Sequence, residues 1–594
     1  MIHVRAMKTW AVAIPLCAVT FGCTGTVSTP DDAQAGNSPV GNPPGLGGAS
    51  SAGGNGSASA GTSPRGGASA AGGTAGASPS GAGSGGLVDG VEPSSGPRPV
   101  TLEGTPLFSR FLRLTNDQWE RSAREILRLE GPTGVSQGFL GSVAGTTDFA
   151  NNEKVVIVNN TIADDFQKAA EALADTVTMT DAALQKVVAT SDADTFIKTF
   201  GRRAFRRDLT ADEATKFRAI FDSGSATMQG TQSAFTKGAN WVIATMLQSP
   251  HFLYRVELGD AGAPLSGFEM AAKLSLWIKD TTPTDALLDA ASSLTTPDGV
   301  ATQVAKLLED PSSLEVMRKF HAELYKFALF DSIAKTSVNG YVPEMNAEFE
   351  QASTLFFDRI YQQNLGVRDI LTSTVGFVGP KTASIYGVTA PGSGMMQMEL
   401  PGRVGYFSQA PFLALWARNN EPDSIHRGVR LNLDTMCADP GLPSVVPNPP
   451  TAGANQTNRE VITNLTSGCA KVCHGELINP IGFAFENFDG LGRMRDTDNG
   501  QPVDTSGVYS FVEGRLGFSG APELMERIAS GVQAHQCWAK KMMSYAMERD
   551  LVEADRPLMD TLAATSAASA GSLKQVMVAL AKSDSFRVRA GGVQ

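Results

Sequence analysis

The sequence is poor in the features that mark nucleic-acid binding and the common enzyme classes. Lys and Arg number 49 against 60 Asp and Glu, which gives a formal net charge of −11, and no basic stripe is visible. Because nucleic-acid binding requires clustered positive charge to neutralise phosphates, we do not expect a nucleic-acid partner. The chain also lacks a Gly-x-Ser-x-Gly elbow, a phosphate-binding loop and a dinucleotide fingerprint. It has no fixed-period repeat, so a solenoid is not expected.

The N-terminal apolar run is short. It spans residues 10–19 (WAVAIPLCAV) and follows Arg5 and Lys8. A run of this length cannot span a bilayer as a stable helix, and the pattern predicts an export signal over residues 1–22. A small residue stands directly before Cys23, which resembles a lipoprotein cleavage site, so we expect Cys23 to carry a lipid. Ordinary cleavage that leaves a free thiol is the alternative.

Residues 23–100 consist mostly of Gly, Ser, Ala, Thr and Pro, as in GGASSAGGNGSASAGTSPRGG. Such a segment cannot bury enough apolar surface to offset the entropy of ordering the chain, so it is expected to be a disordered tether. Together with the leader and Cys23, it predicts a body exported to the periplasm or the cell surface and held to a membrane by a lipid anchor.

The remainder predicts a mainly α, multidomain body. Two capping boxes open helices, one with Thr115 and Gln118 and one with Thr210 and Glu213, and apolar residues follow each at helical spacing. Proline- and glycine-rich breaks divide the body into two helical domains and a C-terminal module, which we place at residues 101–258, 259–400 and 401–594. Within that module, residues 502–520 carry glycine punctuation and alternating side chains, which predicts a short β-hairpin.

Cysteine is scarce, with six in 594 residues. Cys17 would leave with the leader and Cys23 would become the anchor. The four others lie in the last third of the chain and are Cys437, Cys469, Cys473 and Cys537. In an oxidising compartment an even number can pair. We expect Cys437 and Cys537 to form a disulfide, rather than remain free thiols, and to contribute about 2–4 kcal/mol.

The segment CAKVCH, from Cys469 to His474, is the strongest chemical motif. Covalent haem attachment needs two thiols that add to the vinyl groups and a histidine beside the second thiol as axial iron ligand; the usual spacing is Cys-x-x-Cys-His, one residue shorter than here. Zinc is disfavoured, because adjacent Cys and His rarely reach one tetrahedral ion and no second ligand pair follows. The residues alone leave haem and a disulfide, between Cys469 and Cys473 or to Cys437 or Cys537, as open alternatives.

A resemblance favours haem. The chain is similar to large exported bacterial proteins built from serial domains of unknown function that end in a cytochrome c-like haem motif. The matching segments run in order from about residue 105 to the C-terminus and include RLTNDQW, RRAFRRDLTADE, LQSPHFLYRVELG, HRGVRLNLDTMCADPGLPSVVPNPP and CAKVCHGELINPIGFAFENFDGLGRMRDTDNGQPVDTSG. That family has Cys-x-x-Cys-His followed by Asp-Pro-x-Gly, whereas this chain has the longer spacing and Asn479 in place of the Asp.

The resemblance implies one covalent haem c, with Cys469 and Cys473 as thioether anchors and His474 as the axial iron ligand. The sixth iron ligand is not defined by the sequence; the candidates are Met494, His535, Met542, Met543 and Met547. The apolar Phe483, Phe485 and Phe488 would either wall a haem or form the core of the module.

The function expected from these residues is extracytoplasmic electron transfer or a coupled oxidation, with a redox partner protein or a surface polymer as substrate. Two alternatives remain open at this point: a non-enzymatic, disulfide-stabilised surface lipoprotein with a helical binding scaffold, and a haem peroxidase or oxidase.

Overall fold

The computed structural model of the protein describes residues 97–108, 110–141, 147–156, 158–335, 338–419, 421–441, 453–467 and 473–591. The leader, Cys23 and all but the last residues of the expected tether therefore lie outside the described residues, as does Cys469. Inter-residue contacts divide the chain into units 1–80 and 81–594, of which the second contains all that follows. No helix in the described ranges combines the length and apolarity needed to cross a membrane.

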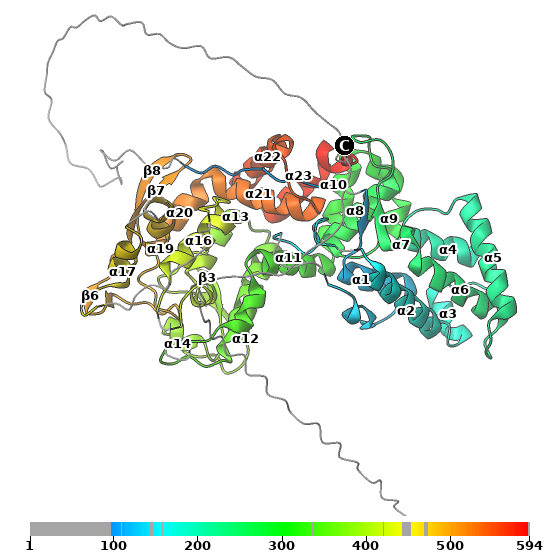
Figure 1. Ribbon diagram of the computed structural model, residues 1–594, viewed down its shortest axis with the longest axis horizontal. Coiled ribbons are helices and arrows are strands. Elements are labelled where there is room, and N and C mark those ends of the chain that lie inside the picture. Colours follow the sequence, from blue (N-terminus) through cyan, green and yellow to red (C-terminus); the bar gives the residue numbers. More distant parts are fainter. Residues whose placement is uncertain are drawn as a thin grey trace, which may run out of the picture. The chain divides into compact units, whose positions relative to one another are not determined.

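The first part of the body is helical (Figure 1). Its elements are β1 (Phe111–Arg113), α1 (Asn116–Leu127), η1 (Val135–Gly138), α2 (Asn160–Val177), α3 (Asp181–Val187), α4 (Ala193–Phe205), α5 (Ala211–Thr227), α6 (Ala234–Gln248), α7 (Pro250–Leu253) and β2 (Tyr254–Val256). Both expected capping boxes are present, at the N-termini of α1 and α5. These caps satisfy amide groups that a helix cannot pair internally, which explains why the two helices begin where the sequence predicts.

The middle of the body continues the helical pattern. Its elements are α8 (Gly267–Lys279), α9 (Asp285–Asp289), η2 (Ala291–Thr295), α10 (Pro297–Leu308), α11 (Pro311–Leu324), η3 (Phe327–Ser332), α12 (Met345–Gln362), α13 (Val367–Thr372), β3 (Val375–Val378), α14 (Ala383–Tyr386) and β4 (Met396–Glu399).

The last part holds the motif region and the closing helices. It comprises η4 (Tyr406–Ser408), α15 (Ala410–Leu415), α16 (Ser424–Thr435), α17 (Asn458–Leu465), η5 (His474–Ile478), α19 (Asn479–Phe483), β5 (Thr497–Asp498), β6 (Gln501–Pro502), β7 (Ser506–Phe511), β8 (Gly514–Ser519), α20 (Gly520–Ser530), α21 (Val532–Met547), η6 (Glu553–Asp555), α22 (Arg556–Ala567), α23 (Leu573–Lys582) and α24 (Asp584–Arg587).

The fold is mainly α, as expected. Strands occur among the described residues as antiparallel pairs, β1–β2, β3–β4, β5–β6 and β7–β8. The expected hairpin is β7–β8, in which Ser506 lies opposite Ser519 and Phe511 opposite Gly514.

The buried side chains form two apolar clusters in the described part of the chain. One extends from Leu114 to Phe252 and also includes Leu276. The other begins with side chains ahead of α8 and reaches Phe586. This second cluster does not divide at residue 400, where the sequence suggests a boundary.

Contacts between aromatic rings connect the parts of the second cluster that lie before and after residue 400. The ring centroids of Phe356 and Tyr406 are 5.7 Å apart, those of Tyr406 and Phe412 are 6.4 Å apart, and those of Phe412 and Phe485 are 6.5 Å apart. The residues on either side of position 400 therefore share one core, and the motif region is packed onto it.

Two glycines let the motif region lie directly against α16. A Cβ atom at Gly482 would lie 1.9 Å from the carbonyl oxygen of Ser424, and one at Gly428 would lie 2.1 Å from that of Ile478. Any larger residue at either position would force the two backbones apart. The turn that carries His474 is thus fixed to α16 by backbone-to-backbone contact.

Candidate functional site

His474 begins an unusual turn. Residues His474–Ile478 form a single π-helical turn, η5, that continues into α19, and Cys473 is the residue immediately before it. Such turns are rare and occur often at functional sites. Leu477 and Ile478 are buried, whereas Cys473 and His474 are half-buried, so the turn anchors its far end in the core and leaves the thiol and the imidazole at the surface.

The hydrogen bonds of His474 select one tautomer of its ring. Nδ1 lies 3.2 Å from Oδ1 of Asn479. The amide of Asn479 is itself oriented, because its Nδ2 donates to Oγ1 of Thr466 at 2.8 Å. The Asn479 oxygen can only accept, so Nδ1 carries the hydrogen and Nε2 carries the lone pair.

Burial also keeps this imidazole neutral. Desolvation lowers the pKa of His474, and this effect outweighs the hydrogen bond that Nδ1 donates to Asn479, which acts in the opposite direction. A neutral ring with Nδ1 hydrogen-bonded and a lone pair on Nε2 is the form in which histidine ligates a metal. The residues present therefore fit an axial ligand role for His474.

A buried arginine fixes the segment that follows α19. The guanidinium of Arg427, on α16, donates to the carbonyl oxygens of Leu413, Phe485, Phe488 and Asp489 at distances of 2.9–3.2 Å. Burial lowers the pKa of Arg427 to about 10, so the group remains charged at neutral pH. The arginine thus ties three carbonyl groups of the irregular chain after α19 to one on α15.

A second buried polar group lies beside it. Oε1 of Glu486 accepts from Oγ of Ser424 and from Nδ2 of Asn458, the latter at 2.8 Å, while Oε2 lies 3.2 Å from Nη2 of Arg495. Burial raises the pKa of Glu486. The network joins α16, α17 and the chain after α19 around one carboxyl group.

A cleft of about 400 Å³ adjoins the His474 turn. Gly475 and Asn479 line it from the turn, and Thr466 lines it from the end of α17. The hairpin β7–β8 supplies the opposite side, including Val508 and Arg515. The size lies within the range of small-molecule sites, which are typically about 300–1,000 Å³.

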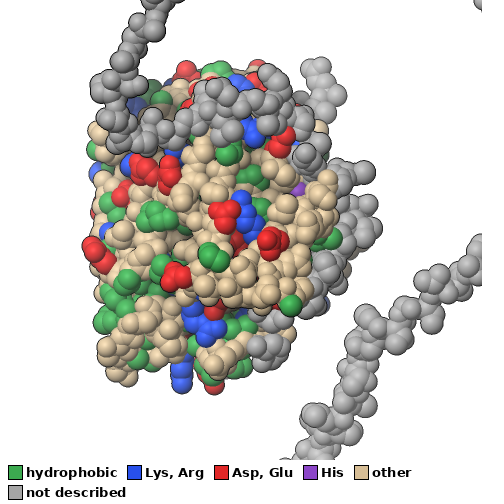
Figure 2. Space-filling model, turned by 90° about the vertical axis from the view of Figure 1, so that its left-hand side faces the viewer, with side chains coloured by type: hydrophobic (Ala, Val, Ile, Leu, Met, Phe, Trp, Pro, Cys, Tyr) green, Lys and Arg blue, Asp and Glu red, His purple; other side chains and the backbone are tan. Residues whose placement is uncertain are grey.

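Figure 2 shows the side of the molecule over α17 and β6, where Lys and Arg are interspersed with Asp and Glu among uncharged groups.

The phenylalanines of the motif are core residues. Phe483, Phe485 and Phe488 are 5%, 0% and 1% exposed, and the last two belong to the large apolar cluster. Only Phe483 also lines the cleft. Of the two interpretations open from the sequence, the core role therefore applies to Phe485 and Phe488.

The candidate sixth ligands lie elsewhere. Met494 is 52% exposed, and Met542, Met543 and Met547 are buried in the core from α21. Both ring nitrogens of His535 are occupied, since Nδ1 lies 2.8 Å from Oγ of Ser566 and Nε2 lies 3.2 Å from the carbonyl oxygen of Ala529. None of the five lines the cleft beside the His474 turn.

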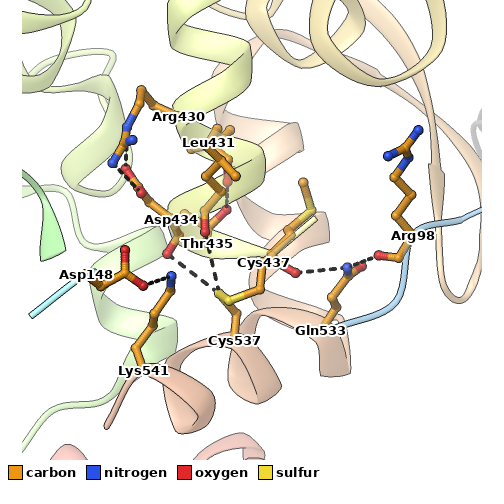
Figure 3. Close-up of a disulfide and its surroundings, with 12 residues drawn as sticks. Arg98, Asp148, Arg430, Leu431, Asp434, Thr435, Cys437, Gln533, Cys537 and Lys541 are labelled. Atoms are coloured by element: carbon orange, nitrogen blue, oxygen red, sulfur yellow. Dashed lines mark hydrogen bonds and ion pairs between the residues drawn. A yellow bond between two sulfur atoms is a disulfide. The ribbon is translucent and has the colours of Figure 1, made fainter. Parts of the chain in front are cut away.

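Cys437 and Cys537 form a disulfide, the pairing expected from the sequence. Their Cα atoms are 5.2 Å apart, and the bridge connects the chain just beyond α16 to α21 (Figure 3). Cys473 is a free, half-buried thiol. Because Cys437 and Cys537 bind each other, neither is left to pair with Cys473 or with Cys469, which lies outside the described residues.

The surroundings of the disulfide are fully packed. Cys437 is 9% exposed and Cys537 is 0% exposed. Nε2 of Gln533 donates to the carbonyl oxygens of Met436 and Arg98, at 3.0 and 2.6 Å. Asp434 pairs with Arg430 at 2.6 Å, and burial raises the pKa of Asp434 to about 6. Figure 3 shows Asp434 of α16 and Gln533 of α21 beside the bridge, with Gln533 bonded to Arg98 of the segment before β1.

Sequence patterns do not identify several residues of this site. Arg459, on α17, and Arg515, on β8, line the cleft but come from elements that lie before and after the motif. Thr466 orients Asn479 from outside the motif. One local pattern does indicate a buried polar group: Glu486 is a charged residue within the aromatic run FAFENF, and in the structure it lies in a buried hydrogen-bond network. Across the residues that the structure describes, no cluster of three or more His, Cys, Asp or Glu is arranged to hold a metal ion.

Four protein families match the chain, and each is described as a protein of unknown function. In order along the sequence they are DUF1595 (residues 192–257), DUF1592 (residues 265–388), DUF1588 (residues 403–498) and DUF1585 (residues 516–586). The DUF1588 match contains the CAKVCH motif, α16, α17 and η5. No curated protein and no solved structure matches the chain. The chain therefore belongs to the proteins that are built from these serial domains of unknown function.

Proposed function

We propose that the protein is an exported c-type haem protein that acts in extracytoplasmic electron transfer or in an oxidation coupled to it. His474 would be the axial iron ligand, and Cys469 and Cys473 would be the thioether anchors. Each thiol would add across a vinyl C=C bond, with sulfur bound to one carbon and the thiol hydrogen to the other, so attachment consumes no oxidant. A bound haem would supply one-electron chemistry.

The tautomer of His474 is the observation that carries the proposal. Its Nδ1 is hydrogen-bonded to an oriented amide and its pKa is lowered, which leaves a neutral Nε2 available as a ligand. The free, half-buried thiol of Cys473 directly before His474 is the second supporting feature.

The remaining parts of the chain fit an extracytoplasmic setting. A disulfide between Cys437 and Cys537 is stable only where thiols are not kept reduced. We propose that the leader ends before Cys23, that a lipid on Cys23 anchors the protein, and that the helical body docks a redox partner or a surface polymer. The disulfide also supports the competing scaffold function, in which the protein is a disulfide-stabilised surface lipoprotein without a redox group.

One experiment separates the two functions. The full chain is expressed with its leader in a host that carries a cytochrome-maturation system, and the visible spectrum of the purified protein is recorded before and after acid–acetone extraction. Covalent haem predicts a Soret band that survives the extraction. A folded, colourless protein would support the scaffold, and a five-coordinate spectrum would favour a peroxidase or oxidase.

A further inference from the structure

Two of the sequence segments that carry the family resemblance lie outside the proposed haem site and meet at one cleft. RRAFRRDLTADE contains the end of α4, and LQSPHFLYRVELG contains α7 and β2. Together with the start of α8 they line a cleft of about 340 Å³, here called the Arg206 cleft. This volume lies within the range of small-molecule sites, about 300–1,000 Å³. None of its described lining residues belongs to the CAKVCH motif.

The Arg206 cleft is rich in positive charge. Its described lining contains one carboxylate, Glu269, and four arginines, which are Arg206, Arg207, Arg255 and Arg589. The chain as a whole has a formal net charge of −11, so the excess in this cleft is opposite in sign to that of the protein. Cations that line a partly enclosed space attract an anionic ligand, provided that the protein does not neutralise all of them.

Three of the four arginines are paired with carboxylates of the protein. The N–O distances are 2.6 Å for Arg589 and Glu269, 2.8 Å for Arg255 and Glu548, and 2.8 Å for Arg207 and Glu213. These pairs offset three of the charges and leave the fourth, that of Arg206.

Arg206 is a buried cation without a carboxylate partner among the described residues. It is 4% exposed, and its guanidinium donates to the carbonyl oxygens of His251, Phe252 and Tyr254 at 2.8–3.3 Å. These bonds fix the chain from α7 to β2, but the carbonyl groups carry no net charge. Burial and, after it, the positive charge of Arg255 lower the pKa of Arg206 to about 9, so it remains charged at neutral pH.

The buried Arg427 shows what is missing at Arg206. It also donates to several carbonyl oxygens, but the carboxylates of Glu486 and Asp423 act against the lowering of its pKa. No described carboxylate has this effect on Arg206, whose charged neighbour is another arginine. An anion bound in the Arg206 cleft would supply the counter-charge.

Arg207 offers donors that a ligand can reach. Glu213 occupies the edge formed by Nη1 and Nη2, with both N–O distances 2.8 Å. The other edge, formed by Nε and the second hydrogen of Nη2, has no acceptor among the described residues, and the side chain is 31% exposed. An open guanidinium edge matches the two oxygens of a carboxylate.

Much of the remaining lining is apolar. Phe205, Leu258 and Phe268 contribute to it, and Leu258 is 53% exposed. The ring of His251 packs on Phe205, with centroids 5.0 Å apart. Desolvation and the charge of Arg207 lower the pKa of His251, so this ring is neutral at pH 7. A ligand that fits the Arg206 cleft therefore combines an anionic group with an apolar body.

We propose that the Arg206 cleft binds a small carboxylic acid whose body is an apolar ring or chain. Arg207 binds the carboxylate through its open edge, Arg206 attracts it through its uncompensated charge, and Phe205 and Phe268 contact the apolar body. This site lies outside the proposed haem site, and its function does not depend on haem.

The test uses the full-length protein and two probes of the same shape, 2-naphthoate and 2-naphthamide, in equilibrium dialysis. We expect the protein to bind the carboxylate at least ~10-fold more tightly than the amide, because hydrogen bonds to ionised groups are stronger than neutral ones. Equal affinity for the two probes, or no binding of 2-naphthoate at ~1 mM, would overturn the proposal.

The decisive variant removes Arg207 without leaving its carboxylate partner unpaired. Arg207→Gln combined with Glu213→Gln keeps the net charge of the protein and should reduce the preference for 2-naphthoate to below ~3-fold. Glu213→Gln alone retains Arg207, and glutamine can still complete the capping box of α5, so this variant should keep the preference. An undiminished preference in the double variant would contradict the proposal.

A charge-balanced control lies on the same helix as Glu213. Arg218 pairs with Asp222 at 2.9 Å on α5, and neither lines the Arg206 cleft. Arg218→Gln combined with Asp222→Asn should leave the preference for 2-naphthoate unchanged. Equal losses in the two double variants would show a general effect on the domain and would contradict a site at Arg207.

A second measurement locates the bound probe. A carboxylate in the Arg206 cleft places negative charge near His251, so 2-naphthoate should raise the pKa of His251, whereas 2-naphthamide should not. NMR titration of protein labelled with [13C]histidine measures this pKa, and His251→Gln assigns the resonance. If 2-naphthoate binds but leaves the pKa of His251 unchanged, the ligand lies elsewhere and the proposal is wrong.

Discussion

Two cysteine-containing regions in the last part of the chain differ in burial and in hydrogen bonding. The Cys437–Cys537 bridge is buried, and the groups around it are hydrogen-bonded or ion-paired (Figure 3). Cys473 and His474 are half-buried, begin a π-helical turn and adjoin a cleft. The first pair forms a buried cross-link, whereas the second leaves a half-buried thiol beside an imidazole whose pKa is lowered by burial. Residue type alone would not separate these roles; burial and hydrogen bonding do.

The largest expected effect comes from removing the imidazole of His474, on the turn that adjoins the cleft. His474→Ala, expressed with a cytochrome-maturation system, should lose nearly all covalently bound pigment, because no other described histidine lies at this turn. The measurement is the ratio of Soret to protein absorbance. His426→Ala is the control, since His426 is exposed and pairs with Asp423 at 2.7 Å on another side of α16. Equal pigment in both variants would remove His474 from the site.

The next largest effect is expected from removal of the Cys437–Cys537 disulfide. Replacing both Cys437 and Cys537 by Ala should lower the free energy of unfolding by about 2–5 kcal/mol, because the bridge closes a loop across a sequence separation of 100 residues. Denaturant unfolding of the purified proteins measures this.

Cys473→Ala gives the matched comparison. This thiol is free and half-buried, so its loss should change the free energy of unfolding by less than about 1 kcal/mol. A loss as large as that of the double variant would mean that Cys473 has a structural role after all.

A third prediction concerns the protonation of His474. Burial lowers the pKa of His474, so its neutral form persists below the usual value of 6.5. The unfolded chain then binds more protons than the folded one in the window between the two pKa values, and this group's contribution to stability falls as the pH falls through that window. Asn479→Asp places a carboxylate on Nδ1, which favours the imidazolium and should raise the pKa of His474.

NMR titration of protein labelled with [13C]histidine measures that pKa, and His474→Ala assigns the resonance. Asn479→Ala removes the hydrogen bond without adding charge, and it should lower the pKa further because the bond raises it in the wild type. An Asn479→Asp protein with an unchanged or lower pKa would contradict the hydrogen bond seen at this turn.

The smallest loss predicted from removing a hydrogen bond is that of the residue that orients Asn479. Thr466→Val removes the acceptor for Nδ2 of Asn479 and should cost about 1 kcal/mol in denaturant unfolding. Thr463→Val is the control, because Thr463 lines the same cleft without bonding to Asn479. Similar values for the two variants would show that Thr466 does not hold the amide.

The sequence predicts local structure well where the signal is local. Thr115 and Thr210 open the helices that their capping boxes indicate, and the glycine-punctuated stretch around Gly514 forms the expected hairpin. Each of these depends on residues within a few positions of one another. The Cys437–Cys537 disulfide could also be predicted, because only four cysteines remain after Cys23.

The sequence does not predict features that depend on packing between distant segments. The continuity of the core at residue 400 depends on ring contacts such as that between Phe412 and Phe485, which no local pattern encodes. The same holds for Arg459 and Arg515, which reach the cleft from separate elements. The tautomer of His474 required the orientation of Asn479, and that orientation is set by Thr466.

The most direct test of the haem assignment is peptide mass spectrometry of the mature protein after export with a cytochrome-maturation system. The account predicts that the peptide containing Cys469 and Cys473 carries one haem through two thioether bonds. Recovery of that peptide without haem, either with Cys469 and Cys473 joined to each other or with both thiols alkylatable, would contradict it.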